Sequence, residues 1–347
     1  MKKSLLILVA SGVLAAGPVS AQTPSSVQQY QDVQRQQEQM RKMKEEKEKS
    51  PEQAPELYPG ENADVGPQFL LKAMPRRQWV EASADSQYYY TSNAFLTKET
   101  TPGSNTDTGL LVSTIQVAFA PTPFDVPGGQ LAPRLGFRHQ WYNYGLDQTS
   151  AQDLPSGLNS LDFDAQTLFV DATYRFAQLW SATIGLDATR LLGHEPPMVN
   201  YQEFYKELVP HIGIERVFPI NDNAAVSVGY NNYTHVTSVD PFPSSNANNR
   251  MEHSFLLTYT HQIIPNLIAQ PYYRFTYSDY TNFTNNNRRA DMLQSLGLSV
   301  AYYFNNWASV RTFMSYDNND SEGNATSDVF DYENINAGGG VNLTFRY

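Results

Sequence analysis

The clearest structural signal in the chain is the segment Ile335-Asn336-Ala337-Gly338-Gly339-Gly340-Val341-Asn342-Leu343-Thr344-Phe345-Arg346-Tyr347. Apolar residues or glycine fill its odd positions, and asparagine, threonine, arginine or glycine fill its even positions. Successive side chains of a β-strand point to opposite faces. The alternation therefore predicts a strand with one face suited to lipid and the other to water.

The same alternation recurs along most of the chain. Phe255 and Leu257 alternate with Ser254 and Thr258, and the pattern continues in the segments on either side. An even strand count is typical of a single-chain bacterial barrel whose termini share one side of the membrane. The alternating segments predict twelve strands, at residues 78–91, 107–120, 132–145, 161–176, 180–192, 203–218, 222–236, 249–264, 266–281, 288–304, 306–319 and 330–347.

The connections between these segments differ in length on the two sides. Short turns are expected after the fourth, sixth, eighth and tenth strands, at 177–179, 219–221, Pro265 and Asn305. The connections after odd-numbered strands are mostly longer and polar, as in outer-membrane barrels with short periplasmic turns and long external loops. The exception is the proline-rich stretch 121–131, which is long for its side. The longer connections are 92–106, 146–160, 193–202, 237–248, 282–287 and 320–329.

Composition narrows the class of protein. The 347 residues include no cysteine, which excludes disulfides and thiolate sites, and the net charge of −11 argues against a nucleic-acid partner. The chain is 13% aromatic and 17% charged, with a mean hydropathy of −0.47. This is too aromatic for a disordered protein and too polar for a helical membrane protein. A transmembrane β-barrel fits, because its two-faced strands average to moderate polarity.

The N-terminal part has a different composition. Residues 1–21 contain an early lysine pair, a short apolar run and small residues before Gln22, which predicts a cleaved secretory signal peptide. Residues 22–77 form a polar extension rich in Gln, Glu and Lys, followed by a proline-containing linker. This extension is interpreted as either a helix or a disordered tether in the periplasm. The barrel is expected over residues 78–347.

The signal peptide, the asymmetric connections and the C-terminal segment together resemble the bacterial outer-membrane β-barrel superfamily. The resemblance implies an all-β, single antiparallel barrel in outer-membrane lipid with both termini in the periplasm. It also implies that Leu343, Phe345 and Tyr347 form the signal read by the barrel assembly machinery. Tyr347 departs from the phenylalanine that more often ends this signal.

Alternation assigns six acids and six arginines to the inner face of the barrel. Rings of charged side chains set selectivity in channels, which favours a narrow pore for small hydrophilic solutes. The alternative is that opposite charges pair across the lumen and satisfy one another. The pore-lining candidates are Glu81, Asp85, Arg134, Arg138, Asp171, Arg175, Asp187, Glu215, Glu252, Arg274, Arg311 and Arg346. Aromatic residues assigned to the same face are Tyr89, Tyr142, Phe169, Tyr233, Tyr272 and Phe313.

Catalysis finds little support in the sequence. His253 adjoins Ser254, but neighbours in a strand face opposite ways and cannot form a nucleophile and base pair. His235 lies near Ser238 and Asp240 in a cluster of low specificity. The chain contains no HExxH, GxSxG or P-loop pattern. We therefore expect no enzyme, cofactor or metal site. A narrow channel is the first hypothesis, a structural or adhesive surface barrel the second and an outer-membrane hydrolase the third.

Overall fold

The structure is a computed structural model that describes residues 79–96, 98, 107–146, 161–177, 179–193, 201–238, 248–281, 289–323 and 330–347. The proposed signal peptide and polar extension lie outside these residues. Within the described part of the chain, no helix is long and apolar enough to cross a membrane.

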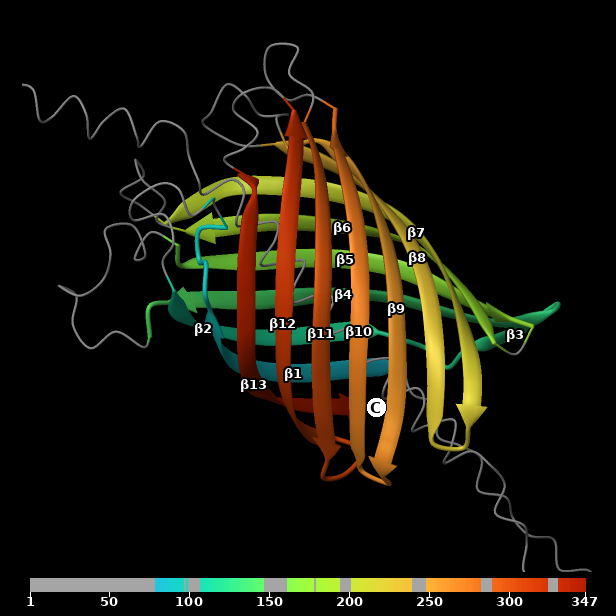
Figure 1. The fold of residues 1–347 in the computed structure, drawn as a ribbon. Helices are drawn as coiled ribbons and strands as arrows, with labels where there is room; N and C mark the ends of the chain where they lie inside the picture. Colours follow the sequence, from blue (N-terminus) through green and yellow to red (C-terminus); the bar gives the residue numbers. More distant parts are fainter. Residues whose placement is uncertain are drawn as a thin grey trace, which may run out of the picture.

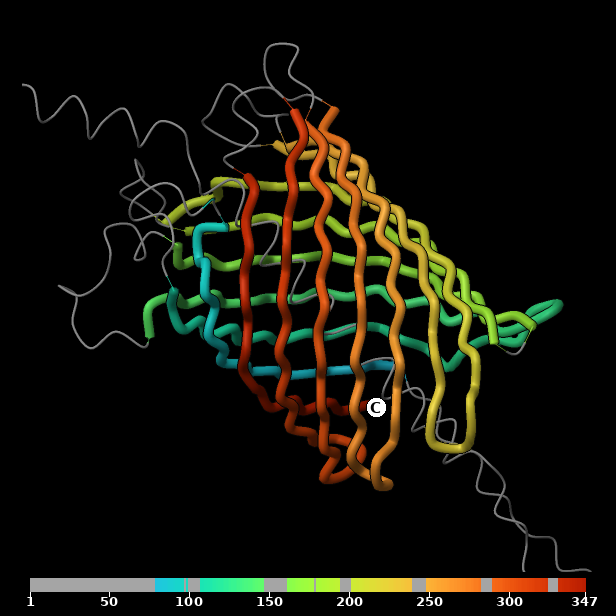
Figure 2. Tube along the Cα trace, in the orientation of Figure 1, coloured from blue at the N-terminus to red at the C-terminus, as the bar shows by residue number. Residues whose placement is uncertain are grey.

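The described residues form one antiparallel β-sheet that closes on itself. Its strands follow one another around the wall in chain order, without a crossover (Figure 2). The strands are β1 (Val80–Thr91), β2 (Thr108–Phe119), β3 (Phe124–Val126), β4 (Gly129–Tyr144), β5 (Phe163–Phe176), β6 (Trp180–Gly193), β7 (Gln202–Asn221), β8 (Ala224–Ser238), β9 (Arg250–Ile264), β10 (Leu267–Tyr280), β11 (Arg289–Tyr303), β12 (Ala308–Gly323) and β13 (Tyr332–Arg346).

Two pairings close the barrel. Strand β1 pairs with β13, from Glu81 opposite Arg346 to Thr91 opposite Asn336. Strand β2 pairs directly with β4, so β3 lies outside the closed ring and pairs only with the start of β4. The wall therefore contains twelve antiparallel strands, as the sequence predicted, and the β3–β4 hairpin projects from it on the side of the short turns (Figure 1).

The hairpin explains the long, proline-rich connection that stood out in the sequence. Residues 121–131 contain β3, a tight turn and the first residues of β4. Gly128 has a φ of 85°, which glycine adopts without the steric cost of a Cβ atom. The connection is long for its side because it contains this hairpin, in which three residues on each side pair across the turn.

Other strand ends also extend past the predicted boundaries. Strand β7 continues to Asn221 rather than 218, and β12 to Gly323 rather than 319. In both cases cross-strand pairing continues, with Asn221 opposite Ala224 and Gly323 opposite Arg289. Pro219 was predicted to begin a turn, but a register irregularity next to it lets the strand continue.

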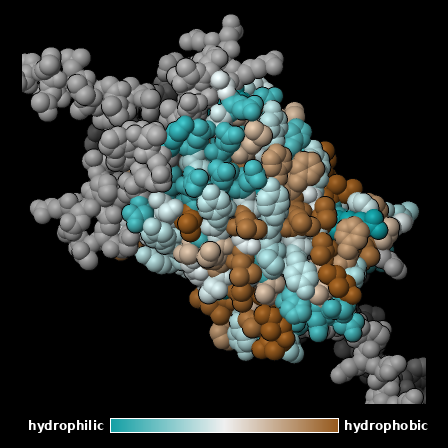
Figure 3. Space-filling model, viewed as in Figure 1, coloured by the Kyte–Doolittle hydropathy of each residue, from teal (hydrophilic) through white to brown (hydrophobic). Residues whose placement is uncertain are grey.

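The two faces of the wall differ in polarity. Leu168, Ile184 and Leu296 are each at least 60% exposed on the outer face, whereas their neighbours Thr167 and Ser295 are fully buried on the inner face. Hydrophobic residues cover the middle and lower part of the face formed by β9–β13 (Figure 3). A closed wall with an apolar exterior satisfies every strand edge and presents its apolar face to lipid.

Aromatic rings gather near the short turns. Phe176 and Trp180 stack beside the β5–β6 turn with their ring centroids 6.2 Å apart, and Trp307 stacks on Phe345 at 5.9 Å. Amphipathic rings sit favourably at the boundary between acyl chains and headgroups. These pairs therefore mark one edge of the apolar band.

Candidate functional site

The interior of the barrel holds the charged residues that the sequence singled out. Strand register places all twelve candidates on the inner face, the same face as buried Thr167 and Ser295. Six are buried, namely Glu81, Asp85, Arg138, Glu252, Arg274 and Arg311. The other six are partly buried, namely Arg134, Asp171, Arg175, Asp187, Glu215 and Arg346.

The most enclosed of these contacts joins Arg311 on β12 to Asp85 on β1. The two guanidinium Nη groups donate to the two carboxylate oxygens at 2.8 and 2.9 Å, and Nη2 also donates to Gln87 Oε1 at 2.7 Å. Both charged side chains are only 1% exposed. Bidentate geometry makes this the strong form of an ion pair.

Strand β13 lies between these partners and lets them meet. Arg311 is opposite Gly340, and Gly340 is opposite Gln87. Because Gly340 has no side chain, the guanidinium passes over β13 and reaches β1. Gly338 plays the same part between Phe313 and Tyr89, whose ring centroids are 5.5 Å apart in an edge contact. Side chains of β12 therefore contact β1 across the glycine run Gly338–Gly340 of β13, which we call the glycine floor.

A second charged group lies near the short turns. Arg346 Nε donates to Glu81 Oε2 at 3.0 Å, and Arg134 Nη2 lies 3.7 Å from Glu81 Oε1. Arg134 reaches this carboxylate from β4, across the β2 position occupied by Ala118. Glu81 of β1 therefore contacts arginines of both β13 and β4 at this end of the barrel.

A third charged group lies at the opposite end of the lumen, and only Glu252 of this group was among the pore-lining residues predicted from the sequence. His235 Nδ1 is 3.0 Å from Glu207 Oε2, and its Nε2 is 3.5 Å from Glu252 Oε2. Arg250 Nε lies 3.7 Å from the same Glu252 oxygen. These residues share the alternation of the predicted set, but they lie near strand ends, where a sequence pattern gives the facing least clearly.

This end also contains Arg289, which Asp291 holds with two hydrogen bonds of 2.8 and 2.5 Å. The guanidinium carbon of Arg289 lies 4.3 Å from the Tyr280 ring centroid and 3.4 Å from that of Phe330. Cations are attracted to aromatic faces at such distances. Two arginines, Arg250 and Arg289, thus flank Tyr280 on the inner wall.

Two further buried arginines, Arg274 and Arg138, lie near the middle of the wall. Arg274 Nη2 donates to Ser295 Oγ at 3.0 Å. Arg138 is 8% exposed, and its Nε finds no hydrogen-bond partner among the described residues. Arg138 therefore carries a charge on the inner face without a short carboxylate contact in the described part of the chain.

The aromatic residues assigned to the inner face do lie there, and Tyr89, Tyr142 and Phe313 belong to or pack against a larger apolar cluster. Tyr142 stacks on Phe163 with a centroid separation of 4.3 Å, and Phe163 contacts Phe204 edge-on. The cluster also includes the aliphatic residues Leu110 and Val112 of β2. The apolar cluster therefore occupies one part of the inner wall, and buried polar residues such as Asp85, Arg138 and Thr167 lie on the same strands outside it.

The histidines do not assemble a catalytic centre in the described residues. Ser254 is buried on the inner face, whereas His253 contacts outward-facing Tyr230 at 2.8 Å. His235 faces the lumen with Glu207 and Glu252 rather than Ser238, which corrects the proposed cluster, and Asp240 lies outside the described residues. No group of three metal-binding side chains is found among the described residues.

The predicted assembly signal lies on the strand that closes the barrel. Val341, Leu343 and Phe345 share the outer face of β13. Tyr347 continues the ladder by accepting from Val80 N at 3.0 Å and donating to Val80 O at 2.9 Å. The C-terminal residues are therefore paired to the first strand rather than left as an open edge.

A closed, twelve-stranded antiparallel wall with an apolar exterior and a charged interior is the fold of the bacterial outer-membrane β-barrels. No protein-family model matches the sequence, and no curated protein matches it significantly. Solved structures of this class resemble it in fold, with low sequence identity.

An outer membrane channel from Pseudomonas putida F1 is 13% identical, with a TM-score of 0.48, and the match covers 77% of this chain and 96% of that one. The β domain of the Bordetella autotransporter Brka is 12% identical, with a TM-score of 0.42 and coverages of 78% and 100%. The KdgM porin, solved with disordered oligogalacturonate, is 8% identical, with a TM-score of 0.37 and coverages of 76% and 99%.

Proposed function

We propose that this protein resides in the outer membrane and that its interior forms a narrow path for small hydrophilic solutes. The main support is the distribution of charge along the inner wall. Charged groups occur near the short turns at Glu81, near the middle at Arg138 and Arg274, and at the far end at Arg250 and Arg289. Lumen-facing charges set the electrostatic barrier for permeating ions.

The width of such a path would be limited by side chains. Twelve strands fall between the eight-stranded barrels that side chains fill and the wide porins of about 16 to 18 strands. The inner wall also carries bulky groups such as Tyr142, Phe163 and Arg311, which are nearly or fully buried. The proposal is therefore a channel selective by size and charge rather than an open pore.

A barrel without conductance is the second candidate, and the Arg311–Asp85 pair favours it. Paired charges that are only 1% exposed act as a filled region rather than as free pore charges. Under this alternative the protein serves as a surface scaffold or adhesin, and its interior contributes stability alone.

Conductance separates the two candidates. The purified, folded protein should give discrete current steps in a planar lipid bilayer, with a nonzero reversal potential under a salt gradient. The same preparation, unfolded by heat and added to the bilayer, serves as the control. Absence of steps from correctly folded protein would reject the channel and leave the scaffold.

Location is tested independently. The mature chain is expected to begin at Gln22 and to fractionate with the outer membrane, with both termini reached by protease only from the periplasmic side. Recovery of the protein as a soluble periplasmic species would reject the outer-membrane assignment.

A further inference from the structure

The outer surface of β4–β8 carries a polar row directly beside an apolar row. Strand register aligns His139, Gln166, Arg190, Lys206 and Ser238 across the five strands. One step toward the middle of the barrel, the same register aligns Phe137, Leu168, Ala188, Leu208 and Val236. We call these the polar row and the apolar row. At the boundary between the two rows, the outward-facing side chains change from apolar to polar.

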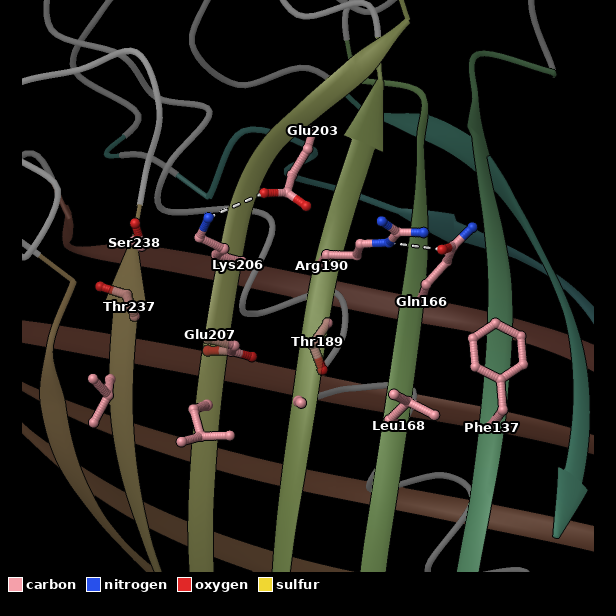
Figure 4. Close-up of a pocket in the computed structure, with 13 residues that line it drawn as sticks. Phe137, Gln166, Leu168, Thr189, Arg190, Glu203, Lys206, Glu207, Thr237 and Ser238 are labelled. Atoms are coloured by element: carbon pink, nitrogen blue, oxygen red, sulfur yellow. Dashed lines mark hydrogen bonds and ion pairs between the residues drawn. The ribbon is translucent and has the colours of Figure 1, made fainter.

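A depression of about 610 Å³ lies along this boundary, with residues of both rows in its lining. Figure 4 shows Gln166, Arg190 and Lys206 above it and Leu168 and Phe137 below. Ala188 stands between Leu168 and Leu208 in the apolar row and is exposed, so its small side chain leaves the wall hollow there. The hollow thus has an apolar floor and a polar upper rim.

Both cations of the polar row face outward from adjacent strands, and Figure 4 shows the Arg190 guanidinium extending toward Gln166 and the Lys206 amine toward Glu203. Arg190 on β6 is directly opposite Lys206 on β7, and both are exposed. Arg190 Nε donates to Gln166 Oε1 at 2.8 Å, which fixes the guanidinium and leaves its Nη groups without a hydrogen bond among the described residues. Cross-strand neighbours lie about 4.5–5.5 Å apart at Cβ, so both long side chains start close together, and a phosphate shared by the two cations would require them to turn toward each other.

Nearby acids are partly neutralised and lie beyond the cations, one step further from the apolar row. Glu203 Oε1 is 3.4 Å from Lys206 Nζ. Asp164 accepts a hydrogen bond from Tyr201 and lies 3.5 Å from His139 Nε2. Desolvation, together with the hydrogen bond and charge of Asp164, raises the pKa of Tyr201 to about 12, so this hydroxyl stays a donor to Asp164 at neutral pH. Glu203 lines the depression together with its ion-paired partner Lys206, and Glu207 also belongs to the lining but is held by His235, so Arg190 is the rim cation without a short carboxylate contact among the described residues.

We propose that this depression binds a phosphorylated lipid, with the phosphate on Arg190 and Lys206 and an acyl chain along Leu168, Ala188 and Leu208. The proposal rests on the outer-membrane location proposed above, since it needs a lipid layer against the apolar row. Bidentate or paired cation contacts to phosphate are strong in a partly desolvated setting. The boundary between the two rows matches the height at which a headgroup meets acyl chains.

Native mass spectrometry of the folded protein released from detergent tests the proposal. The probe is a bis-phosphorylated, multiply acylated glucosamine disaccharide lipid, compared with its dephosphorylated form and with inorganic phosphate alone. The protein should retain the phosphorylated lipid and lose the dephosphorylated one. The R190Q/K206Q variant should weaken retention about tenfold or more, because two charge-assisted contacts are lost.

Two further variants separate the site from general charge attraction. Arg216→Gln removes an outward cation near the short turns, where Arg216 lies over Trp180 and Phe218, and should leave lipid retention unchanged. Ala188→Phe fills the hollow, keeps both cations, and should also weaken retention.

Equal retention by R190Q/K206Q and wild type, or an equal loss in Arg216→Gln, would overturn the proposal. Saturable binding of inorganic phosphate that the two cation variants abolish, without lipid retention, would also overturn it in favour of a simple anion site. Conductance should be unchanged in R190Q/K206Q because both side chains face outward. Failure of this site thus remains distinct from failure of the channel.

Discussion

The contact between Arg311 and Asp85 depends on a glycine, Gly340, on the strand that lies between them. The guanidinium reaches β1 only because Gly340 leaves the space above β13 empty. Alternation in the sequence placed both charged residues on the inner face, but it could not pair them. Pairing depends on register between β12, β13 and β1, and that register comes from barrel closure rather than from any local pattern.

Replacing Arg311 with Gln is expected to lower the free energy of unfolding by about 3–5 kcal/mol, because it leaves the Asp85 carboxylate buried without its partner. The D85N/R311Q double variant should recover part of this loss, since neither charge then remains. Urea titration in detergent, followed by the gel mobility of folded and heat-unfolded protein, measures both. Strictly additive effects of the two substitutions would contradict a direct pair.

At the scale of elements, β13 combines the glycine floor with the C-terminal segment. A Cβ added at Gly338 would lie 2.3 Å from Tyr88 O and 2.2 Å from Tyr89 Cβ, which no small movement of a flexible side chain relieves. Gly229 on β8 is a matched case, because the nearest atom to its Cβ position is 3.9 Å away. The two glycines therefore differ in packing although both are interior strand positions.

Gly338→Ala should destabilise the barrel by about 1–3 kcal/mol through overpacking, whereas Gly229→Ala should have little effect. Thermal unfolding of the two variants side by side, with tyrosine and tryptophan fluorescence as the signal, measures the difference. Equal melting temperatures of the two variants would show that the structure accommodates a Cβ atom at Gly338 without overpacking.

The C-terminal residues are expected to matter more for assembly than the N-terminal extension. Deleting Phe345 to Tyr347 removes the end of the ladder between β13 and β1, whereas deleting residues 22–55 leaves all the described strand pairings in place. The first deletion should strongly reduce the folded fraction in cells, and the second should leave it nearly intact. The measurement is the amount of heat-modifiable protein in outer-membrane fractions of cells that express each variant. Equal yields of the two deletion variants would count against a C-terminal assembly signal.

Strands were predicted correctly from the sequence where alternation of apolar and polar residues is the dominant signal. They were missed where turn-forming residues obscure that alternation. Period-two alternation gave all twelve wall strands, because lipid on one side and polar groups on the other impose it. It missed β3, where prolines and a turn glycine obscure a three-residue strand. It also missed the inner apolar cluster, since Leu110 and Leu111 are adjacent and either could have faced lipid.

At the scale of the whole molecule, the inner wall carries two kinds of charged side chain. Some form close ion pairs, and others have no short contact with an opposite charge among the described residues. Arg311 is held by Asp85, whereas Arg138 has no short carboxylate contact among the described residues. The sequence predicted a lumen with both signs of charge but left open whether pairing or polarisation dominates. The structure contains both arrangements at different heights, a distinction that requires three-dimensional distances.

Arg138→Gln is therefore expected to move ion selectivity toward cations in the proposed channel while leaving thermal stability close to wild type. Removing a lumen cation lowers the barrier for other cations, and no buried acid loses a bidentate partner. Reversal potentials under a salt gradient, measured beside Arg216→Gln as an outward-facing control, check the effect. An unchanged reversal potential in a conducting variant would show that Arg138 does not border the conduction path.

The contact across the glycine floor also has a kinetic meaning. Asp85 and Arg311 are 226 residues apart in the chain, and they meet only when the first and last strands have joined. Both groups therefore remain hydrated until the ring shuts, and they lose water in that same late event. Interactions formed after the rate-limiting barrier change the rate of unfolding far more than the rate of folding. We therefore expect this pair to slow the unfolding of the finished barrel more than it changes the rate of folding.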